Sequence, residues 1–372
     1  MFLGNKGVVF PLNKQNLWIV GGGEEAVPGI ERAKQMGLRV IVSDGNSKAP
    51  GFDLADAHFV VSTYDYLAHI RLADKLKHKP DGVICMGCDV PVTVARLAEH
   101  LGCTTIGMFV ATLSADKYWQ KCELRRQGIQ VPRFWNLYKT TLGEVEGQLP
   151  LVIKPIDSRG ARGVRLVRNA ADIRHAYEEA RQYGSGVLAE EFLEGPQIST
   201  ESVITATGAA TPGFSDRNYD FEATYPYMVE NGGTMPSQLS LEQQAQVCWT
   251  AEAAARALGF VNCTAKGDLV LTKDGPKVIE MAARLSGGYF ATDQIPLSTG
   301  VDLVGIAIRL ALGEAVDIQD AIPKKHMPVA IRYQIPDGVK DHTQRGLHHI
   351  ALATSRESAV WQAEYMCRIM GE

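Results

Sequence analysis

The residues whose types and spacing first indicate chemistry are Asp268 and Glu280. They lie in apolar segments, residues 267–272 and 277–281, that a turn over residues 273–276 would join as a β-hairpin. Side-chain alternation along paired strands can place both carboxylates on one face. Two facing carboxylates repel unless a cation lies between them, and Mg²⁺ bound to phosphates prefers such oxygen ligands. The pair therefore indicates a metal site, with a surface hairpin of scattered charges as the alternative.

A second cluster combines Lys154, at the end of a predicted strand, with a basic, glycine-rich turn. The turn consists of Ser158, Arg159, Gly160, Ala161, Arg162 and Gly163. Its backbone N–H and guanidinium groups are donors that suit a polyphosphate. Lys154 would reach the same phosphates, and Arg284, after the second strand of the acidic hairpin, adds a donor for an anion. The alternative is an ordinary solvated turn.

Three further motifs each allow two interpretations. Gly21-Gly22-Gly23 and Asp44 resemble a dinucleotide fingerprint, although glycines also permit a tight turn between a strand and a helix. Residues 190–193 could offer backbone groups to a base edge, or be only an acidic strand end. Cys85 and Cys88 have the spacing of a metal or redox pair, but no second pair completes a zinc site.

The elements that must position these residues change in character along the chain. Short apolar strands alternate with helix-compatible segments up to His100, which predicts a parallel sheet. Ser114 is expected to cap a helix over residues 115–127. From Leu151 onward, a β-hairpin and later paired strands indicate an α+β arrangement. Residues 211–238 show little periodicity.

The composition excludes several classes of protein. Of 372 residues, 45% are apolar and 22% charged, and the formal net charge is −4. These values are ordinary for a soluble globular protein and give no sequence-wide electrostatic footprint for nucleic acid. No apolar run reaches the length of a membrane span, and residues 1–10 show no signal-peptide pattern. Seven cysteines in so long a chain indicate free thiols, so we expect a cytoplasmic protein that binds neither nucleic acid nor membrane.

Taken in order, the motifs resemble the ATP-grasp superfamily of ATP-dependent ligases, of the carboxylate–amine ligase type related to the biotin carboxylase and carbamoyl-phosphate synthase fold. The resemblance is carried by Lys117, Lys154-Pro155, residues 158–163, residues 190–195, Glu201, Asp268, residues 278–280 and residues 284–288. It implies a Rossmann-like N-terminal parallel sheet followed by a two-lobed ATP-grasp fold. The implied domains are residues 1–112, residues 113–190 as a small lobe with a lid hairpin, and residues 191–372 as a large lobe with a short C-terminal region.

The resemblance also implies roles for individual residues. Those expected to bind ATP are Lys117, Lys154, Ser158, Gly160, Gly163, Glu190, Glu191, Phe192, Gln197 and Glu201. Those expected to assist catalysis are Arg284, Lys266, Arg159 and Arg162. Glu190 would accept from the adenine amino group, with Phe192 offering its backbone. Asp268 and Glu280 would hold Mg²⁺, or Mn²⁺ in its place.

Three departures from the family pattern bear on these roles. Gln197 stands where the family often has a ribose-binding glutamate. Ala282 stands where a metal-binding asparagine is frequent, which leaves one Mg²⁺, or Glu280 to bridge two. The segment after Gly313 is shorter than in several relatives, so substrate contacts usually made there are expected to be missing.

The reaction implied by the resemblance is ADP-forming ligation of a small-molecule carboxylate and an amine through an acyl phosphate, in a protein that could be a homodimer. Arg217 is the best candidate for a carboxylate clamp, with a surface salt bridge as the alternative. Other functions remain open: a carboxylase or purine-pathway ligase of the same fold that uses bicarbonate or formate, a non-catalytic nucleotide-binding regulator, or an NAD(P)-dependent oxidoreductase that uses Gly21-Gly22-Gly23 and Asp44.

Overall fold

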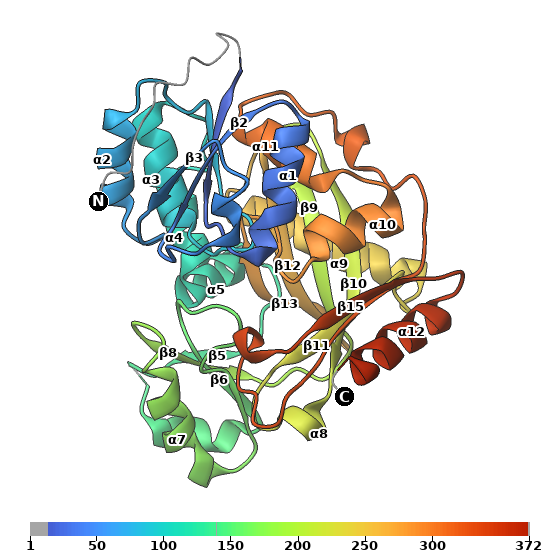
Figure 1. Cartoon of the computed structure of the whole chain (residues 1–372). Coiled ribbons are helices and arrows are strands. Elements are labelled where there is room, and N and C mark those ends of the chain that lie inside the picture. Colours follow the sequence, from blue (N-terminus) through green and yellow to red (C-terminus); the bar gives the residue numbers. More distant parts are fainter. Residues whose placement is uncertain (1–13, 139, 371–372) are drawn as a thin grey trace.

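The computed structural model describes residues 14–138 and 140–370 and arranges them around three β-sheets (Figure 1). The first sheet is parallel, and the second and third are antiparallel. This order confirms the parallel sheet predicted at the start of the chain and the α+β region after it. The expectation that residues 1–10 carry no signal peptide concerns residues outside the described part.

The first sheet has the strand order β3-β2-β1-β4. Its elements are β1 (Asn16–Val20), α1 (Val27–Gln35), β2 (Arg39–Asp44), β3 (Ala57–Val60), α2 (Tyr66–Lys75), β4 (Gly82–Ile84) and α3 (Pro91–Leu101). The side chains of β1 alternate between two cores: Leu17 and Ile19 pack with α1, whereas Trp18 and Val20 pack with α2 and α3. Both faces of β1 are therefore buried, as is usual for a parallel strand between layers of helices.

A helix from much later in the chain completes the first of these cores. It is α11 (Leu303–Ala311). Its side chains Val304 and Ile308 belong to the same hydrophobic cluster as Leu17 and Ile19. One core therefore joins the first sheet to the C-terminal half, and it sets where the loop after β4 lies relative to the third sheet.

Two short helices connect the first sheet to the second. They are α4 (Met108–Ala115) and α5 (Lys117–Arg126). The expected single helix capped by Ser114 is wrong, because Asp116 is extended between the two helices and its carboxylate accepts from the N–H of Trp119. A carboxylate caps a helix as well as a hydroxyl does, and Ser114 instead accepts from the N–H of Ala283. As a result, α5 begins at Lys117.

The second sheet has the strand order β5-β8-β6-β7 and forms the small lobe at the lower left of Figure 1. Its elements are β5 (Phe134–Asn136), α6 (Leu142–Val145), β6 (Leu151–Pro155), β7 (Arg165–Val167), α7 (Ala170–Ala180) and β8 (Val187–Glu191). The predicted hairpin is confirmed, with Leu151 of β6 opposite Val167 of β7. Residues 158–163, called the lid loop below, connect these two strands.

The third sheet has the strand order β13-β12-β9-β10-β11-β14-β15. Its strands are β9 (Gln197–Ile204), β10 (Ala209–Tyr219), β11 (Glu230–Met235), β12 (Cys263–Thr272), β13 (Gly275–Ala282), β14 (Val329–Tyr333) and β15 (His348–Leu352). The remaining helices are α8 (Phe221–Thr224), α9 (Leu241–Ala257), α10 (Ile295–Thr299) and α12 (Arg356–Ile369). The predicted acidic hairpin is confirmed as β12 and β13, and Asp268 stands directly opposite Glu280.

The sequence analysis missed two strands in residues 211–238, for reasons visible in their composition. β10 contains Pro212, beside a shift in its pairing with β9, and a proline in a strand is tolerated at such irregularities. β11 contains two glycines, which are poor strand formers. At Gly232 a Cβ would lie only 2.0 Å from the carbonyl oxygen of Ile331, so the close approach of β14 requires glycine there.

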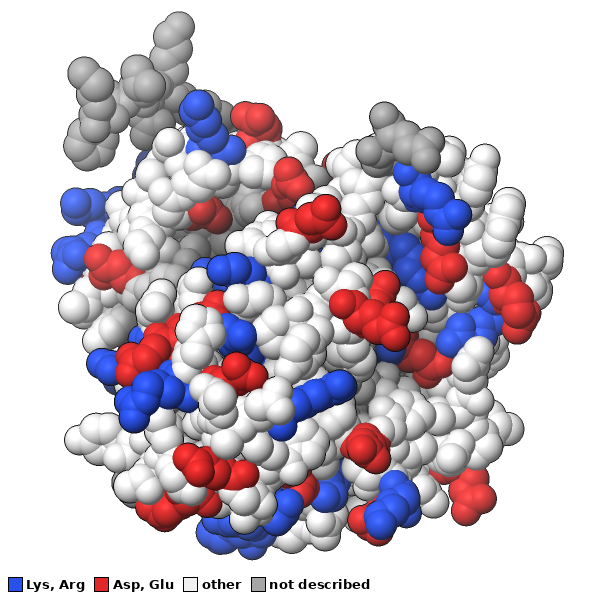
Figure 2. All heavy atoms as spheres, turned by 90° about the horizontal axis from the view of Figure 1, so that it is seen from below, with Lys and Arg blue, Asp and Glu red and all other residues white. Residues whose placement is uncertain are grey.

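The outer surface carries charges of both signs. Figure 2 shows Lys and Arg interspersed with Asp and Glu over the face seen from below. Such a mixed face, among the described residues, is not the continuous basic surface typical of nucleic-acid binding. Across residues 14–138 and 140–370, no helix combines the length and apolarity needed to span a membrane.

Candidate active site

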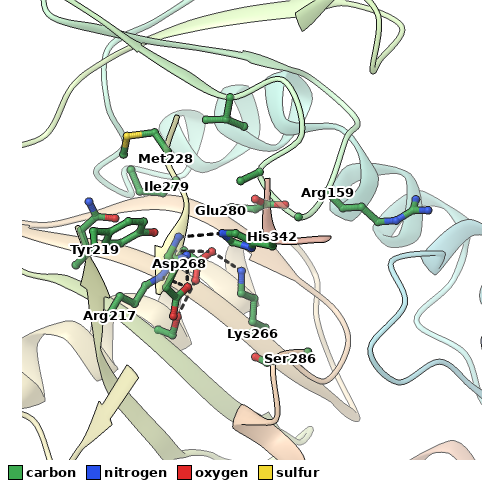
Figure 3. A pocket seen from close by; sticks show the side chains of 18 of the residues that line it. Arg159, Arg217, Tyr219, Met228, Lys266, Asp268, Ile279, Glu280, Ser286 and His342 are labelled. Carbon is green, nitrogen blue, oxygen red and sulfur yellow. Dashed lines mark hydrogen bonds and ion pairs between the residues drawn. The ribbon is translucent and has the colours of Figure 1, made fainter. Parts of the chain in front are cut away.

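A cavity of about 480 Å³ lies where the three sheets meet. Its walls come from the loop after β4, from the lid loop and β6, and from β9, β12, β13 and the β14–β15 connection. Figure 3 shows Arg217, Lys266 and Asp268 directed toward one another, whereas Arg159 is directed away from them. A cavity of this size with convergent charged groups is the expected form of a small-molecule site.

Three lysines lie buried at one end of the cavity. Lys154 on β6 and Lys121 on α5 both contact the carboxylate of Glu190 on β8, at 2.9 and 3.0 Å. Lys117, at the start of α5, donates to the carbonyl oxygen of Ser158 in the lid loop at 2.6 Å. The fold thus brings Lys117 and Lys154 together from separate segments, and it adds a third cation that the sequence analysis did not identify.

The lysine pair bears on the interpretation of Glu190. Its side chain is buried and both lysines contact its Oε1 atom, while the residue lines the cavity, so the expected contact with an adenine amino group stays a prediction. Its position also orients Lys154. Lys121 is detectable in the sequence by its spacing, because residues four apart share one face of a helix and Lys117 precedes it by four. Burial lowers the pKa of Lys121 to about 8.

In the segment after β8, one backbone N–H is bonded within the protein and the next is available to a ligand. The N–H of Phe192 donates to the carbonyl of Pro150 at 3.1 Å, so the backbone donor expected from Phe192 is already used. Among the described residues, no group accepts from the N–H of the next residue, Leu193, which lines the cavity. Glu191 and Gln197 line the same wall. We therefore assign the available backbone donor at this end to Leu193.

Two glycines of the lid loop adopt backbone conformations that other residues disfavour. Gly160 and Gly163 have φ angles of 61° and 69°, in the left-handed region that side chains disfavour. Arg162 lines the cavity. The guanidinium of Arg159 lies 4.6 Å from the ring centroid of Tyr64 in the first sheet's domain, so in this conformation Arg159 bridges the lid loop to that domain.

The acidic pair lies at the centre of the cavity and is surrounded by cations. Asp268 contacts Lys266 and lies 3.3 Å from Arg217, and Glu280 lies 3.2 Å from Lys117. Burial raises the pKa of each carboxyl group, but Arg217 and Lys266 at Asp268, and Lys117 at Glu280, outweigh it and leave both pKa values below their usual range. Both carboxylates are therefore charged at neutral pH.

Arg284 reaches the cavity from the turn after β13 and is held by the first domain. It donates to Asp89 at 3.2 Å and to the carbonyl of Leu285 at 3.0 Å. Burial opposes the charge of Asp89, but Arg284 outweighs it and lowers its pKa. The sequence analysis missed Asp89, although it closely follows β4, and ligands of parallel sheets bind at the carboxyl ends of strands.

The cysteine pair before Asp89 does not form a metal site. Cys85 and Cys88 are free thiols, and burial raises their pKa values to about 12 and about 11. A thiol with so high a pKa is a poor nucleophile and a poor ligand at neutral pH. In the described part of the chain, no three or more His, Cys, Asp or Glu side chains form a cluster that could hold a metal ion.

The glycine turn after β1 forms hydrogen bonds within the protein. Asp44 accepts from the N–H of Gly22 at 2.8 Å and from the N–H of Asn46 at 2.8 Å. Neither Asp44 nor Gly22 lines the cavity. This arrangement favours the structural interpretation of the glycines over the dinucleotide fingerprint.

Comparisons with known proteins agree with this geometry. The sequence model of the ATP-grasp domain family matches residues 114–288, a span that contains both the lysines and the acidic pair. Residues 114–288 of this chain match the ATP-grasp domain. The D-alanine–D-alanine ligase of Cupriavidus pinatubonensis is 28% identical over 315 residues, which cover 81% of this chain and 88% of that enzyme. Carnosine synthase 1 of Mus musculus is 26% identical over 93% of this chain and 44% of its own length.

A solved structure shows the same fold over nearly the whole chain. The L-amino acid ligase of Bacillus licheniformis superposes with a TM-score of 0.77 and covers 95% of this chain and 96% of its own. The identity is 20%, so this likeness concerns the fold. It confirms the expected order of a Rossmann-like sheet and a two-lobed ATP-grasp fold.

The residues of the acidic pair fit the Mg²⁺ that the ATP-grasp resemblance implies. Asp268 and Glu280 are charged, face the cavity from paired strands, and supply the hard oxygen donors that Mg²⁺ prefers. Ala282, the residue of β13 opposite Lys266, has no donor to add. The chain therefore offers two carboxylates, and phosphate oxygens and water are left to fill the other coordination positions.

Glu201 does not line the cavity, in contrast to its expected role in binding ATP. It is fully buried in β9, and its carboxylate accepts from the N–H of Ser286 at 3.0 Å and from the hydroxyl of Ser286. Its function here is to hold the turn that follows Arg284. Burial raises the pKa of Glu201 to about 7.

The raised pKa of Glu201 predicts a pH-dependent stability. Because the folded state binds this proton more tightly than the unfolded chain, the stabilisation is fully present below the unfolded pKa of 4.5 and is lost as pH rises through about 7. The difference corresponds to about 3 kcal/mol. Glu201→Gln should remove this component, so urea unfolding at pH 5 and pH 8 should differ less than in the wild type. The exposed Glu146→Gln is the control, and identical pH profiles for Glu201→Gln and wild type would contradict the prediction.

The buried lysine pair predicts a large loss of stability on truncation. Lys121→Met leaves Glu190 with one cation and the carbonyl of Ile279 without its donor, which should cost about 3 to 5 kcal/mol. Lys34→Met removes an ion pair with Asp56 from the surface and should change stability by less than about 1 kcal/mol. Urea denaturation measures both variants. Equal effects would show that the pair with Glu190 is not buried in solution.

Proposed function

We propose that this protein is an ATP-dependent, ADP-forming ligase that joins a carboxylate to an amine through an acyl phosphate. The observation that carries the proposal is the acidic pair Asp268 and Glu280, charged and central in one cavity with Lys117, Lys154 and Arg284. The names of two sequence relatives, a D-alanine–D-alanine ligase and a carnosine synthase, support this reaction class. The same names support an amino acid as the carboxylate substrate.

The first half-reaction is phosphoryl transfer to the substrate carboxylate. A carboxylate oxygen attacks the γ-phosphorus of ATP, the bond from that phosphorus to the bridging oxygen breaks, and ADP leaves. Lys117 and Lys154 would neutralise phosphate oxygens, while Asp268 and Glu280 would hold Mg²⁺. When bound, Mg²⁺ neutralises charge on the phosphate oxygens. Lys266, beside Asp268, would stabilise the charge of the transferring group.

The second half-reaction is displacement of phosphate by the amine. The amine nitrogen attacks the carbonyl carbon, the carbon–oxygen bond to phosphate breaks, and the nitrogen releases its proton to phosphate or water. Arg284 would bind the acyl phosphate, and Asp89 fixes its guanidinium for this purpose. Arg217, bound to Glu230 and close to Asp268, is a buried positioning group rather than a surface salt bridge.

The alternatives have less support. Solved structures of purine-pathway ligases and biotin carboxylases match with 14–20% identity, which concerns the fold alone. A regulator without catalysis would not need the charged residues Lys266, Asp268, Glu280 and Arg284 in one cavity. A dinucleotide-dependent oxidoreductase would need the glycine turn, which Asp44 already occupies.

We extend the proposal to the properties of the whole protein. The proposed division into residues 1–112, 113–190 and 191–372 is supported by the three sheets, although β8 of the second sheet ends at Glu191, one residue past the second boundary. A cytoplasmic location is supported by seven free thiols, which persist in a reducing compartment. A homodimer is supported by Trp361 and Tyr365, which stack with each other on the exposed face of α12. Mn²⁺ could replace Mg²⁺, because both prefer oxygen ligands.

The proposed metal role predicts a separation of binding from turnover in Glu280→Gln. ATP should bind within a few-fold of wild type, because Lys117 and Lys154 still line the cavity. ADP release with a panel of amino acids and amines should fall on the order of 100-fold, because a misplaced γ-phosphate reacts slowly. Calorimetry and a coupled ADP assay measure the two quantities, with the exposed Glu146→Gln as control. Near-normal turnover in Glu280→Gln would contradict the assigned metal site.

Ligand-dependent melting tests the nucleotide itself. ATP with Mg²⁺ should raise the melting temperature of the wild type, whereas NADH should not, because only a ligand of the native state stabilises it by mass action. The shift should shrink in Lys154→Ala, taken relative to its own melting temperature, and persist in the surface variant Lys34→Ala. A larger shift with NADH than with ATP would favour the oxidoreductase alternative.

A further inference from the structure

The β14–β15 connection, residues 334–347, reaches from the third sheet to the lid loop. The backbone N–H of His342 donates to the carbonyl of Gly160 at 2.9 Å. His342 is the first residue of the short 3-10 helix η6 (His342–Gln344), and its side chain lines the cavity. The expectation that the segment after Gly313 makes no substrate-side contacts is therefore not supported, because this segment lies against both the lid loop and the cavity.

The imidazole of His342 has one defined tautomer. It lies near Asp268 and Lys266 (Figure 3). Its Nε2 accepts from the backbone N–H of Glu230 at 3.3 Å, so the proton of the neutral ring is on Nδ1. Burial and then the positive charge of Arg345 hold the pKa of His342 well below its usual value. At neutral pH the ring is uncharged and carries a single N–H.

That N–H has no acceptor within the described protein, and the backbone of His342 and of Glu230, which binds the ring, is held by Arg345. Arg345 donates to the carbonyl of His342 at 3.2 Å and to the carbonyl of Glu230 at 3.3 Å. The carboxylate of Glu230 binds Arg217, which reaches Asp268. The Nδ1–H is thus a fixed, unpaired donor linked through two residues to the acidic pair.

We propose that His342 is a catalytic residue, whose Nδ1–H donates to an oxygen of the transferring phosphoryl group, and whose backbone N–H joins this donor to the closed lid loop. The role rests on the proposed ligase function. This role agrees with the hydrogen bonds of the ring, in which Nε2 accepts from the N–H of Glu230 and Nδ1–H has no protein partner. A general base would need an unprotonated nitrogen toward the substrate, and in this tautomer the unprotonated nitrogen already accepts from Glu230.

Binding of a phosphoryl mimic tests the donor without turnover. The probes are ADP with Mg²⁺, alone and with aluminium fluoride, measured by calorimetry. In His342→Phe, which keeps a ring but no donor, affinity for the fluoride complex should fall about 100-fold, the usual effect of losing such a donor. Affinity for ADP alone should stay within about threefold, because ADP carries no transferring group.

The conservative variant separates a donor from a structural ring. An asparagine side-chain amide can place N–H where Nδ1 stands, so His342→Asn should recover most of the affinity for the fluoride complex and most of kcat for ADP release. Gln344→Ala, in the same turn and exposed, is the matched control. Equal loss in the Phe and Asn variants, or equal loss for ADP with and without fluoride, would overturn the donor role. A wild type that gains no affinity from fluoride would instead contradict the ligase function itself.

A proline variant tests the backbone contact with the lid loop. Proline is tolerated at the first position of a helix, and His342→Pro removes the N–H to Gly160, whereas His342→Phe retains it. With the fluoride complex bound, trypsin should cut after Arg159 and Arg162 faster in the Pro variant than in the Phe variant, because an undocked loop is accessible. Equal cleavage rates would overturn the proposed link between lid and donor.

Discussion

The arrangement of the cavity depends on the mutual compensation of buried charges from distant segments. Asp89, Glu190, Asp268 and Glu280 each have a cation from another segment within 3.3 Å. A buried carboxylate without its partner costs several kcal/mol, so these segments are stable in the interior only when they meet. Arg159, Arg162 and Arg345 also line the cavity and add positive charge, which suits a polyphosphate.

The same compensation explains the role of the first sheet. Its glycine turn is closed by Asp44, and its contribution to the cavity is instead Asp89, which fixes Arg284. The shared core of β1, α1 and α11 fixes the position of Asp89 relative to the third sheet. A domain that resembles a dinucleotide-binding half therefore acts here by orienting a cation on another domain.

Much of this architecture follows from local sequence signals. The hairpin that carries Asp268 and Glu280 is predictable because both strands are apolar and a turn separates them. The strands of the first sheet are predictable for the same reason. Lys121 and Asp89 could have been found by helical spacing and by position after a strand. His342 could not, because no local pattern near it indicates that a loop after β14 returns to a lid loop nearly half the chain upstream.

Two of the predicted site residues have partners that the sequence does not reveal. Glu190 and Glu201 are acidic residues at the ends or in the middle of apolar strands, where the sequence shows burial but not partners. In the structure, two lysines contact Glu190 and a serine donates to Glu201. Whether a buried carboxylate serves a ligand or the fold is decided by which distant side chains reach it, and that information is tertiary.

The strand order of the third sheet has a consequence for protein synthesis. β14 pairs with β11 and β15, so two strands that leave the ribosome after β13 complete a sheet whose centre emerged much earlier. Long-range strand pairing of this kind forms slowly, and domains fold as their segments emerge. A growing chain can present its lysines and acidic hairpin to a nucleotide, yet it lacks the surface on which the lid loop rests. The proposed reaction would therefore require β14, β15 and their connection to be in place before His342 can hold the lid loop.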